Sequence, residues 1–331
     1  MGSVFNQKII DKLFEVSKEL GYVELTAAVS VNGQREYRMW NGEGEQPFFE
    51  YNYEIGSITK TFTGLLVAKA IGLGKAGFND SLSLWFPEIE KNVALPSIKQ
   101  LVTHSAGYAS YFPAIEDDNS ETLETPKNPL ENLKREDLIA SLQKVKNYET
   151  SYPHAYSNFG AALAGLLVER IFKKSYKELM EELFFELGMK KTIMYPTGEI
   201  GLHGYDKNGK CCESWCWPET CGFAPAGSLV STAHDMINYC EAILKKDKPY
   251  IPISVDPLAL YINDGTKIEI GCFWFLLSDY SILYFFGETF SFNAAIAIDI
   301  KEKNSLVLLS NRHMPGSGDF IISLLLSLRN G

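Results

Sequence analysis

The stretch EIGSITKTFTGLLVAKAIGLG, residues 54–74, organises the rest of the chain. Its apolar run and closing glycines predict a helix that begins near Ser57 and ends at the glycines. Lys60 follows Ser57 by three residues and therefore shares its helix face. A serine hydroxyl beside a desolvated lysine can act as a nucleophile, because burial disfavours the charged amine. An N-cap serine with an exposed lysine is the simpler explanation of the segment Ser57–Lys60.

Strand-like runs lie on both sides of this helix in the sequence. Upstream, VELTAAVSV (23–31), Asn32-Gly33 and QREYRMW predict a hairpin, since Asn-Gly is the preferred two-residue turn. Downstream, short polar turns separate four runs and predict antiparallel pairing: GCFWFLL (271–277), SILYFF (281–286), FNAAIAIDI (292–300) and SLVLLSN (305–311). With helices expected at 4–20 and 319–329, the fold class is α/β of the α+β type. One antiparallel sheet is built from both chain ends and flanked by helices.

The middle of the chain has a different character. Residues 76–222 contain helical segments joined by polar loops, of which 97–107 and 158–172 are the clearest. We therefore expect two parts. Residues 1–75 and 223–331 form the sheet part, and 76–222 form a mainly helical part, with the active site in the cleft between them.

Composition excludes several functional classes. The 331 residues are 46% hydrophobic and 22% charged, which is typical of a globular protein with a large core. The net charge of −10 and the lack of a Lys/Arg run argue against nucleic-acid binding. No window approaches the ~18 apolar residues of a membrane span. The first residues lack the apolar stretch of a signal peptide, so a cytoplasmic location is expected. The oligomeric state is left open.

A second element, Tyr156-Ser157-Asn158, precedes the apolar helix predicted at 158–172. In an extended segment, residues i and i+2 point the same way, so Tyr156 and Asn158 would project together. A phenol beside a lysine can carry a proton between nucleophile and leaving group, and an amide can dock a substrate carbonyl or hold the lysine. Taken alone, a tyrosine here would more simply be a packing residue.

The order of several stretches along the chain is more specific than either element alone. They are FEYNYEIGSITKTFTGLLVA, SIKQLVTHSAGY, SYPHAYSNFGAALAGLLVE, APAGSLVSTAHDMINYCEAIL and FNAAIAIDIKEKNSLVLLSNR. Over roughly residues 25–312 the sequence resembles the β-lactamase-related serine hydrolases, which include class C β-lactamases, penicillin-binding proteins, D-aminopeptidases and family VIII esterases. The resemblance implies an antiparallel sheet with flanking helices plus an all-helical part. It also implies that Ser57 is the nucleophile, Lys60 its activating partner, Tyr156 a general base and acid, and Asn158 a polar positioner.

The third motif departs from this family. Where the family has Lys-Thr-Gly or His-x-Gly, this chain has Phe285-Phe286-Gly287. Gly287 permits close backbone approach to a substrate. The resemblance implies that the N–H of the next residue, Glu288, forms an oxyanion hole with the N–H of Ser57. Because Phe285 carries no charge and Glu288 is acidic, we expect the site to disfavour carboxylate-bearing substrates and to accept neutral or amine-bearing esters and amides. Alternatively, the Glu288 side chain points to solvent and only its amide counts.

The predicted function is therefore a serine hydrolase that forms an acyl-enzyme on an ester or amide. The expected type is an esterase or peptidase rather than an efficient β-lactamase. Its partner would be a small-molecule or peptide acyl substrate, and no metal or organic cofactor is needed. Two alternatives stay open: a transacylase on the same fold, and a catalytically impaired binding module similar to a penicillin-binding protein.

Several cysteines, two tryptophans and a histidine also have residue types that can belong to a functional site. The spacing of the four cysteines between Cys211 and Cys221 does not match paired Cys-x-x-Cys zinc ligands, so reduced thiols near the cleft rim are expected. Trp215 and Trp217 in that loop would form either a wall for the acyl group or part of the core. His104 is expected to be a buried structural histidine.

Overall fold

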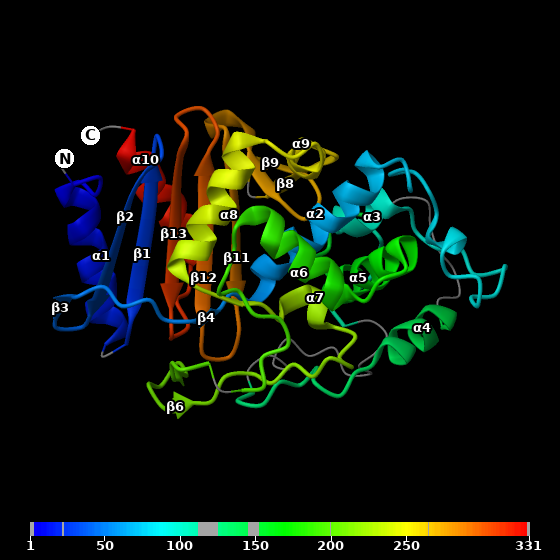
Figure 1. Ribbon diagram of the computed structural model, residues 1–331, viewed down its shortest axis with the longest axis horizontal. Helices are drawn as coiled ribbons and strands as arrows, with labels where there is room; N and C mark the ends of the chain where they lie inside the picture. The colour runs from blue at the N-terminus through cyan, green and yellow to red at the C-terminus, as the bar shows by residue number, and fades with distance from the viewer. Residues whose placement is uncertain are drawn as a thin grey trace.

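A large antiparallel sheet dominates one half of the molecule in the computed structural model (Figure 1). The structure describes residues 3–21, 23–111, 125–144, 152–198, 200–263 and 265–329. In spatial order the nine strands of the sheet are β3 (Gly44–Gln46), β2 (Gln34–Asn41), β1 (Leu25–Val31), β13 (Asn304–Ser310), β12 (Asn293–Asp299), β11 (Ile282–Glu288), β10 (Phe275–Leu277), β9 (Thr266–Ile270) and β8 (Ala259–Asn263). Strands from the two chain ends therefore meet where β1 pairs with β13.

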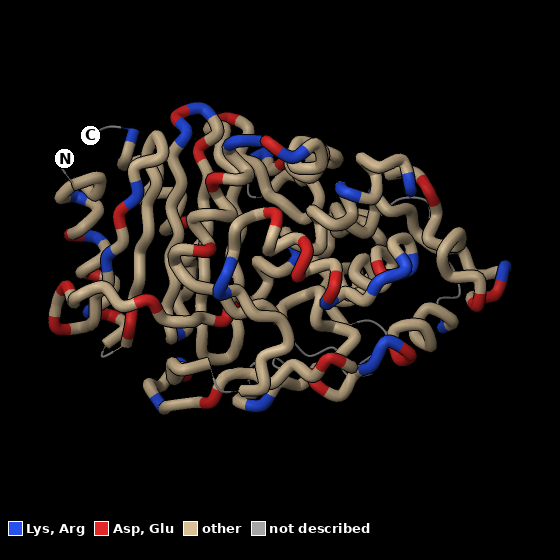
Figure 2. The backbone as a smooth tube through the Cα atoms, viewed as in Figure 1, with Lys and Arg blue, Asp and Glu red and all other residues tan. Residues whose placement is uncertain are grey.

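Helices cover both faces of this sheet. Helix α8 (Ala233–Lys245) lies across one face, and α1 (Gln7–Leu20) and α10 (Ser317–Leu328) pack on the other (Figure 1). Every residue of the central strands β12 and β13 is buried, as expected for strands enclosed on both faces. The central strands are also largely free of charged residues, which lie mostly in helices and loops (Figure 2).

Helix α2 (Thr59–Gly72) connects the sheet to the remaining helices. It is buried on nearly all sides, because it packs against α5 (Asn158–Phe172), α7 (Ala224–Gly227) and α9 (Tyr250–Val255). Around this centre lie α3 (Ile98–Val102), α4 (Arg135–Gln143) and α6 (Tyr176–Leu187). Two short ladders complete the described strands: β4 (Tyr53–Glu54) with β7 (Val230–Ser231), and β5 (Gly204–Tyr205) with β6 (Cys211–Cys212).

The predicted fold class is confirmed, and so are its main elements. Asn32 and Gly33 both have positive φ (51° and 84°), as a type I′ turn requires. One predicted strand was too long. The run 271–277 is a strand only from Phe275, because Cys272 and Phe273 donate their N–H groups to Ser254 and Val102 outside the sheet. The hairpin β8–β9 was not predicted.

The division into parts at residues 75/76 and 222/223 stays a prediction. The segment expected to be helical also contains the β5–β6 hairpin, whose Tyr205 forms a bridge with Arg312 next to β13. Within the described ranges, no helix has the length and apolar character needed to cross a bilayer.

Candidate active site

Ser57 lies in a short 3-10 turn, η1 (Gly56–Ile58), that leads directly into α2. Gly56 has a φ of +47°, in the left-handed region that favours glycine. It also has no room for a side chain, since a Cβ there would lie 2.7 Å from the Glu288 nitrogen. Because Gly56 has no side chain, the turn that carries Ser57 can pack directly against the end of β11.

Lys60 is completely buried one turn after Ser57. Its Nζ lies 2.9 Å from Ser57 Oγ and donates to the carbonyl oxygen of Ala226 at 2.7 Å. Burial holds the pKa of Lys60 well below its ordinary value. A neutral amine has two N–H donors and one lone pair, so it can bond to Ala226 and still accept a proton from Ser57. The structure thus excludes the alternative in which Lys60 is exposed on the surface.

Tyr156 reaches the same serine from the loop before α5. Its hydroxyl forms a hydrogen bond with Ser57, and Lys60 Nζ lies 4.8 Å from the centre of its ring. The residue is 37% exposed at the mouth of the site, but the hydroxyl end is buried. This burial raises the pKa of Tyr156 above its ordinary value, and the bond with Ser57 offsets part of the rise. Tyr156 is therefore a protonated phenol at neutral pH.

His104 accepts hydrogen bonds from the residues on both sides of Tyr156. Its carbonyl accepts the N–H of Ala155 (2.8 Å), its Nδ1 accepts the N–H of Ser157 (3.2 Å), and its ring lies 4.7 Å from the Tyr156 ring. Burial is the main cause that holds the pKa of His104 well below its ordinary value. The histidine is buried, as expected, but its contacts with the candidate base segment were not predicted. Its sequence position gives no signal of them, because 53 residues separate His104 from Ser157.

Asn158 is the first residue of α5 and lines the same cavity as Tyr156. Its Nδ2 donates to Ser110 Oγ at 2.9 Å. Ser157 between them caps the helix, its hydroxyl accepting the N–H of Gly160. The structure therefore brings Tyr156 and Asn158 to one cavity, although Asn158 already belongs to the helix rather than to an extended segment.

The third motif lies at the end of β11, beside Ser57. A Cβ on Gly287 would lie 2.0 Å from the Ile55 oxygen and 2.6 Å from the Ser57 nitrogen. The main chain of the turn that carries Ser57 approaches this glycine closely, a contact that was not predicted, and the approach of a substrate to Gly287 stays a prediction. The glycine is required because two backbones meet here.

The amide of Glu288 is directed towards the same region. Across the hairpin, the N–H of Thr289 donates to Phe292 at 3.0 Å. Successive residues of an antiparallel strand point their N–H groups to opposite edges, so the Glu288 N–H points away from β12. On this edge, β11 pairs with β10 only over Ile282–Tyr284, so the edge at Glu288 lies beyond the β10–β11 ladder.

A cavity of about 530 Å³ opens beside Ser57. Six aromatic residues contribute to its walls: Tyr156, Tyr261, Phe275, Tyr284, Phe285 and Phe286. Phe285 stacks on Phe275 with ring centres 5.1 Å apart. Glu288 and Asp319 also line the cavity, and none of the described lining residues is Lys or Arg.

The side chain of Glu288 contacts other residues of the protein and does not only face solvent. Its Oε1 accepts the side-chain N–H of Asn293 at 3.1 Å, and its Oε2 lies 3.8 Å from His313 Nδ1. Its negative charge also acts on the phenol of Tyr156, because it contributes to the raised pKa of that group. The acidic side chain therefore forms part of the cavity's electrostatic surroundings.

Comparison with known proteins places this arrangement in a family. Residues 10–325 match the family model described as Beta-lactamase. The chain belongs to the beta-lactamase family. A curated relative, the beta-lactamase of Providencia stuartii, is 27% identical over 258 residues, covering 73% of this chain and 61% of its own length. Protein flp of Staphylococcus aureus (strain MW2) is 25% identical over 275 residues, covering 78% of this chain and 52% of its own length. The chain therefore spans only about half to three fifths of these relatives.

Solved structures share the fold of this beta-lactamase-family chain. A class C beta-lactamase superposes with a TM-score of 0.77 at 20% identity, covering 98% of this chain and 96% of that one. A beta-lactamase/D-alanine carboxypeptidase from Pseudomonas syringae gives a TM-score of 0.75 at 16% identity, covering 98% of both chains. The family match supports, in general terms, a serine hydrolase that works through an acyl-enzyme.

The cysteine loop of this family member lies apart from the Ser57 cavity. Three of its cysteines line a separate groove, and all six cysteines of the chain are free thiols. The described residues contain no group of three or more His, Cys, Asp or Glu able to hold a metal. Trp215 and Trp217 are 3% and 2% exposed, so they pack in the core instead of walling the cavity.

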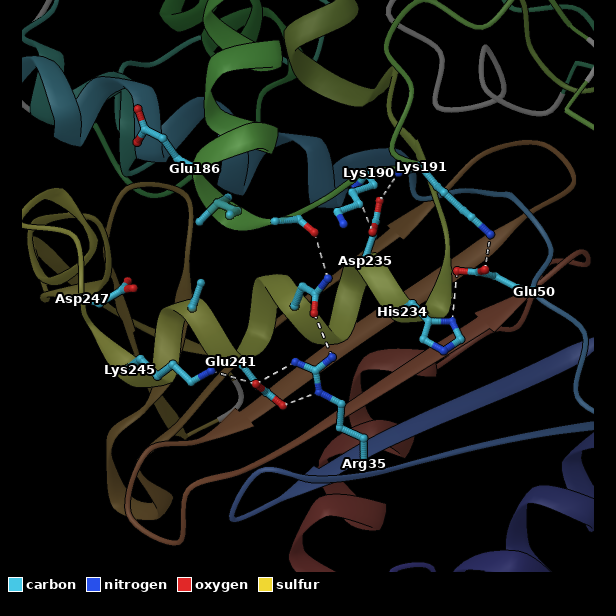
Figure 3. Close-up of a pocket in the computed structure, with 14 residues that line it drawn as sticks. Arg35, Glu50, Glu186, Lys190, Lys191, His234, Asp235, Glu241, Lys245 and Asp247 are labelled. Atoms are coloured by element: carbon cyan, nitrogen blue, oxygen red, sulfur yellow. Dashed lines mark hydrogen bonds and ion pairs between the residues drawn. The ribbon is translucent and has the colours of Figure 1, made fainter.

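A second pocket of about 540 Å³ lies beside α8 (Figure 3). Its charged groups largely pair with one another: Arg35 Nε lies 2.7 Å from Glu241, and Glu50 contacts His234 at 3.0 Å. Asp235 accepts the main-chain N–H of Lys191 at 2.7 Å. Because these charged groups already pair with one another, we assign them a structural function. The candidate active site is therefore the Ser57 cavity.

Proposed function

We propose that this chain is a serine hydrolase that forms an acyl-enzyme on Ser57, with ester or amide substrates whose groups near β11 are neutral or amine-bearing. The observation that carries the proposal is the position of Ser57 Oγ. It lies 2.9 Å from the buried amine of Lys60 and is hydrogen-bonded to the phenol of Tyr156.

The environments of these two partners divide the proton transfers between them. Lys60 is poised to be a neutral amine, so it takes the Ser57 proton as Oγ attacks the substrate carbonyl. Tyr156 is a protonated phenol, so it gives its proton to the departing alcohol or amine and regains one through Lys60. Opposite pKa changes on neighbouring groups commonly separate a base from an acid in this way.

The tetrahedral intermediate needs donors for its oxyanion. The N–H groups of Ser57 and Glu288 are suitable, because their segments lie in contact and the Glu288 N–H is directed to the open edge of β11. Collapse of the intermediate breaks the bond to the leaving group and leaves an ester on Ser57. A water molecule then attacks this ester and releases the acid.

The cavity supports the choice of substrate class. Its walls are aromatic, its described lining contains no Lys or Arg, and Glu288 and Asp319 are acidic. A carboxylate placed beside Phe285 would lose water without gaining a cation. The relatives include a beta-lactamase, and β-lactams such as penicillins carry a carboxylate. We therefore expect this chain to be a poor β-lactamase.

Labelling with a fluorophosphonate probe tests the nucleophile. Wild-type protein should take one label at Ser57, and Ser57→Ala should take none. A folded wild-type protein without a label would support the binding-module alternative. Products formed with added amine or alcohol acceptors distinguish a transacylase from a hydrolase.

Two chromogenic esters that differ only in a carboxylate or carboxamide near the leaving group test the substrate class. The neutral ester should have the higher kcat/KM. A clear preference for the anionic ester would overturn the substrate proposal while leaving the hydrolase assignment in place.

A further inference from the structure

The β8–β9 hairpin at the edge of the sheet supplies one wall of the Ser57 cavity. Successive side chains of a strand point to opposite faces of the sheet. Tyr261 and its cross-strand partner Ile268 both line the cavity, whereas the next residue, Ile262, is 66% exposed. The hairpin therefore presents an aromatic ring to the site, and the proposed proton transfers do not use it.

Tyr261 covers the loop that carries the candidate acid Tyr156. Its ring is parallel to that of His154, with ring centres 4.2 Å apart and 3° between the planes. His154 precedes Tyr156 by two residues, and both line the cavity. Burial lowers the pKa of His154, so this imidazole is neutral at neutral pH. The hairpin and the Tyr156 loop therefore meet in an uncharged aromatic stack.

The aromatic wall continues from this stack to the third motif. The ring centre of Phe275 lies 6.3 Å from that of Tyr261 and 6.2 Å from that of His154. Phe285 in turn stacks on Phe275. Such rings favour a flat, apolar group, which can pack against them by its face or its edge. Tyr261 is only partly buried, so its ring can contact such a group although His154 covers one of its faces.

The position of Tyr156 indicates which part of the substrate meets this wall. In the proposed reaction, Tyr156 gives its proton to the leaving oxygen or nitrogen as the bond from that atom to the carbonyl carbon breaks. The leaving atom must therefore lie within hydrogen-bond reach of the Tyr156 hydroxyl. The remainder of the leaving group extends from there into the adjoining space, where His154 and Tyr261 form the wall.

We infer that Tyr261 is a specificity-determining residue of a leaving-group subsite, and that this subsite takes flat, uncharged aromatic alcohols or amines. This inference rests on the proposed function, because the proton transfer from Tyr156 is what places the leaving group on this side of Ser57. It goes beyond that function by naming the chemical class of the leaving group.

The test compares benzyl butanoate with ethyl butanoate, which form the same butanoyl-enzyme and differ only in the alcohol that leaves. Rates of acid release are divided by the number of Ser57 sites that the fluorophosphonate probe labels. Tyr261→Ala should lower kcat/KM about tenfold for the benzyl ester and less than about threefold for the ethyl ester. Each variant is compared with wild type on the same ester, so the difference in intrinsic reactivity between the two esters cancels.

Three further variants control for the ring. Tyr261→Phe keeps the ring and should stay within about threefold of wild type on both esters. Tyr261→Leu keeps apolar bulk without a flat ring and should lower kcat/KM for the benzyl ester about three- to tenfold, which decides the question if Tyr261→Ala does not fold. Ile262→Ala, on the exposed face of the same strand, is the matched control and should leave both esters unchanged.

Decay of the butanoyl-enzyme, followed by mass spectrometry of the intact protein, separates the leaving group from the acyl group. The alcohol has departed before this step, so Tyr261→Ala should leave the decay rate unchanged. A changed decay rate, or equal losses on both esters, would place the acyl group at Tyr261 and overturn the inference. A folded wild type that the probe does not label would overturn the proposed function itself, so the two failures are distinguishable.

Discussion

Gly287 lies so close to the turn that carries Ser57 that a methyl group on it would be 2.6 Å from the Ser57 nitrogen. The same methyl would be 2.0 Å from the Ile55 oxygen, and main-chain atoms cannot rotate away as a flexible side chain can. This contact ties the position of Ser57 to the position of β11.

The first prediction concerns that contact. Gly287→Ala should lower kcat at least about 100-fold, since displacing a reacting group by about 1 Å has effects of that size. It should also lower the free energy of unfolding by about 1–3 kcal/mol through overpacking. Gly160→Ala is the matched control, because a Cβ there meets its nearest neighbour at 3.5 Å. Equal activity of the two variants would contradict the prediction.

The second prediction concerns Lys60. Lys60→Met should slow fluorophosphonate labelling of Ser57 about 10²–10⁴-fold through loss of the base. Lys60→Arg should not restore it, because a guanidinium stays protonated.

Lys60 also makes stability depend on pH. Its pKa is lower in the folded than in the unfolded chain, so the unfolded chain binds more protons below the ordinary value of 10.5. Wild-type stability should therefore rise with pH up to about 10.5 relative to Lys60→Met. Chemical unfolding of both proteins at pH 7, 9 and 10.5 measures this trend, and a constant difference would contradict it.

The third prediction concerns His104. His104→Leu removes the acceptor for the Ser157 N–H and should lower kcat about 10- to 100-fold by releasing Tyr156. His104→Asn should recover part of the rate, because asparagine tolerates the φ of +54° and offers a side-chain oxygen. If both variants labelled Ser57 and turned over like wild type, Tyr156 would not depend on His104.

The fourth prediction is a pH-dependent stability difference at Glu54, which is buried at the end of β4 and accepts the main-chain N–H of Trp215. The folded-state pKa of about 7 lies above the ordinary 4.5, so the neutral carboxyl contributes stability fully below about pH 4.5 and loses it as pH rises through 7. Relative to wild type, Glu54→Gln should gain ~3 kcal/mol in unfolding free energy between pH 4.5 and pH 8. The surface variant Glu19→Gln should show no such trend. Parallel pH curves for wild type and Glu54→Gln would refute this assignment.

The fifth prediction concerns the third motif. Phe285→Lys introduces a cation into the aromatic cavity and should shift the kcat/KM ratio of the anionic to the neutral ester upward about tenfold. Phe285→Met loses the ring without gaining charge and should leave that ratio near the wild-type value. An unchanged ratio in the lysine variant would show that Phe285 does not face the bound acyl substrate.

Much of the fold was predictable from local patterns. The hairpin at Asn32-Gly33 and the helix at 158–172 follow from turn chemistry and continuous apolar character, which neighbouring sequence sets almost alone. The residues at 271–274 have the same strand-like composition, yet tertiary contacts with Ser254 and Val102 take them out of the sheet. Composition cannot reveal such distant partners.

The same limit applies to the site. Ser57, Lys60 and Tyr156 were found because their order and spacing form a motif, and the structure brings them together. Their catalytic roles stay proposals. The contacts of Glu54 and His104 were missed because each joins segments far apart in sequence: 161 residues separate Glu54 from Trp215. The contact of Gly287 with the Ser57 turn was also not predicted, because the sequence does not show which backbone lies opposite.

The pairing of β1 with β13 has a consequence for how the protein is made. Residues 25–31 find their partner strand only at 304–310, so the chain as far as residue 310 must leave the ribosome before the sheet can close. Until then the β1–β2 hairpin exposes an apolar edge, which is the kind of surface on which nascent chains aggregate or recruit chaperones. Packing of the Ser57 turn against β11 and closure of the sheet should therefore be late, coupled events in biosynthesis.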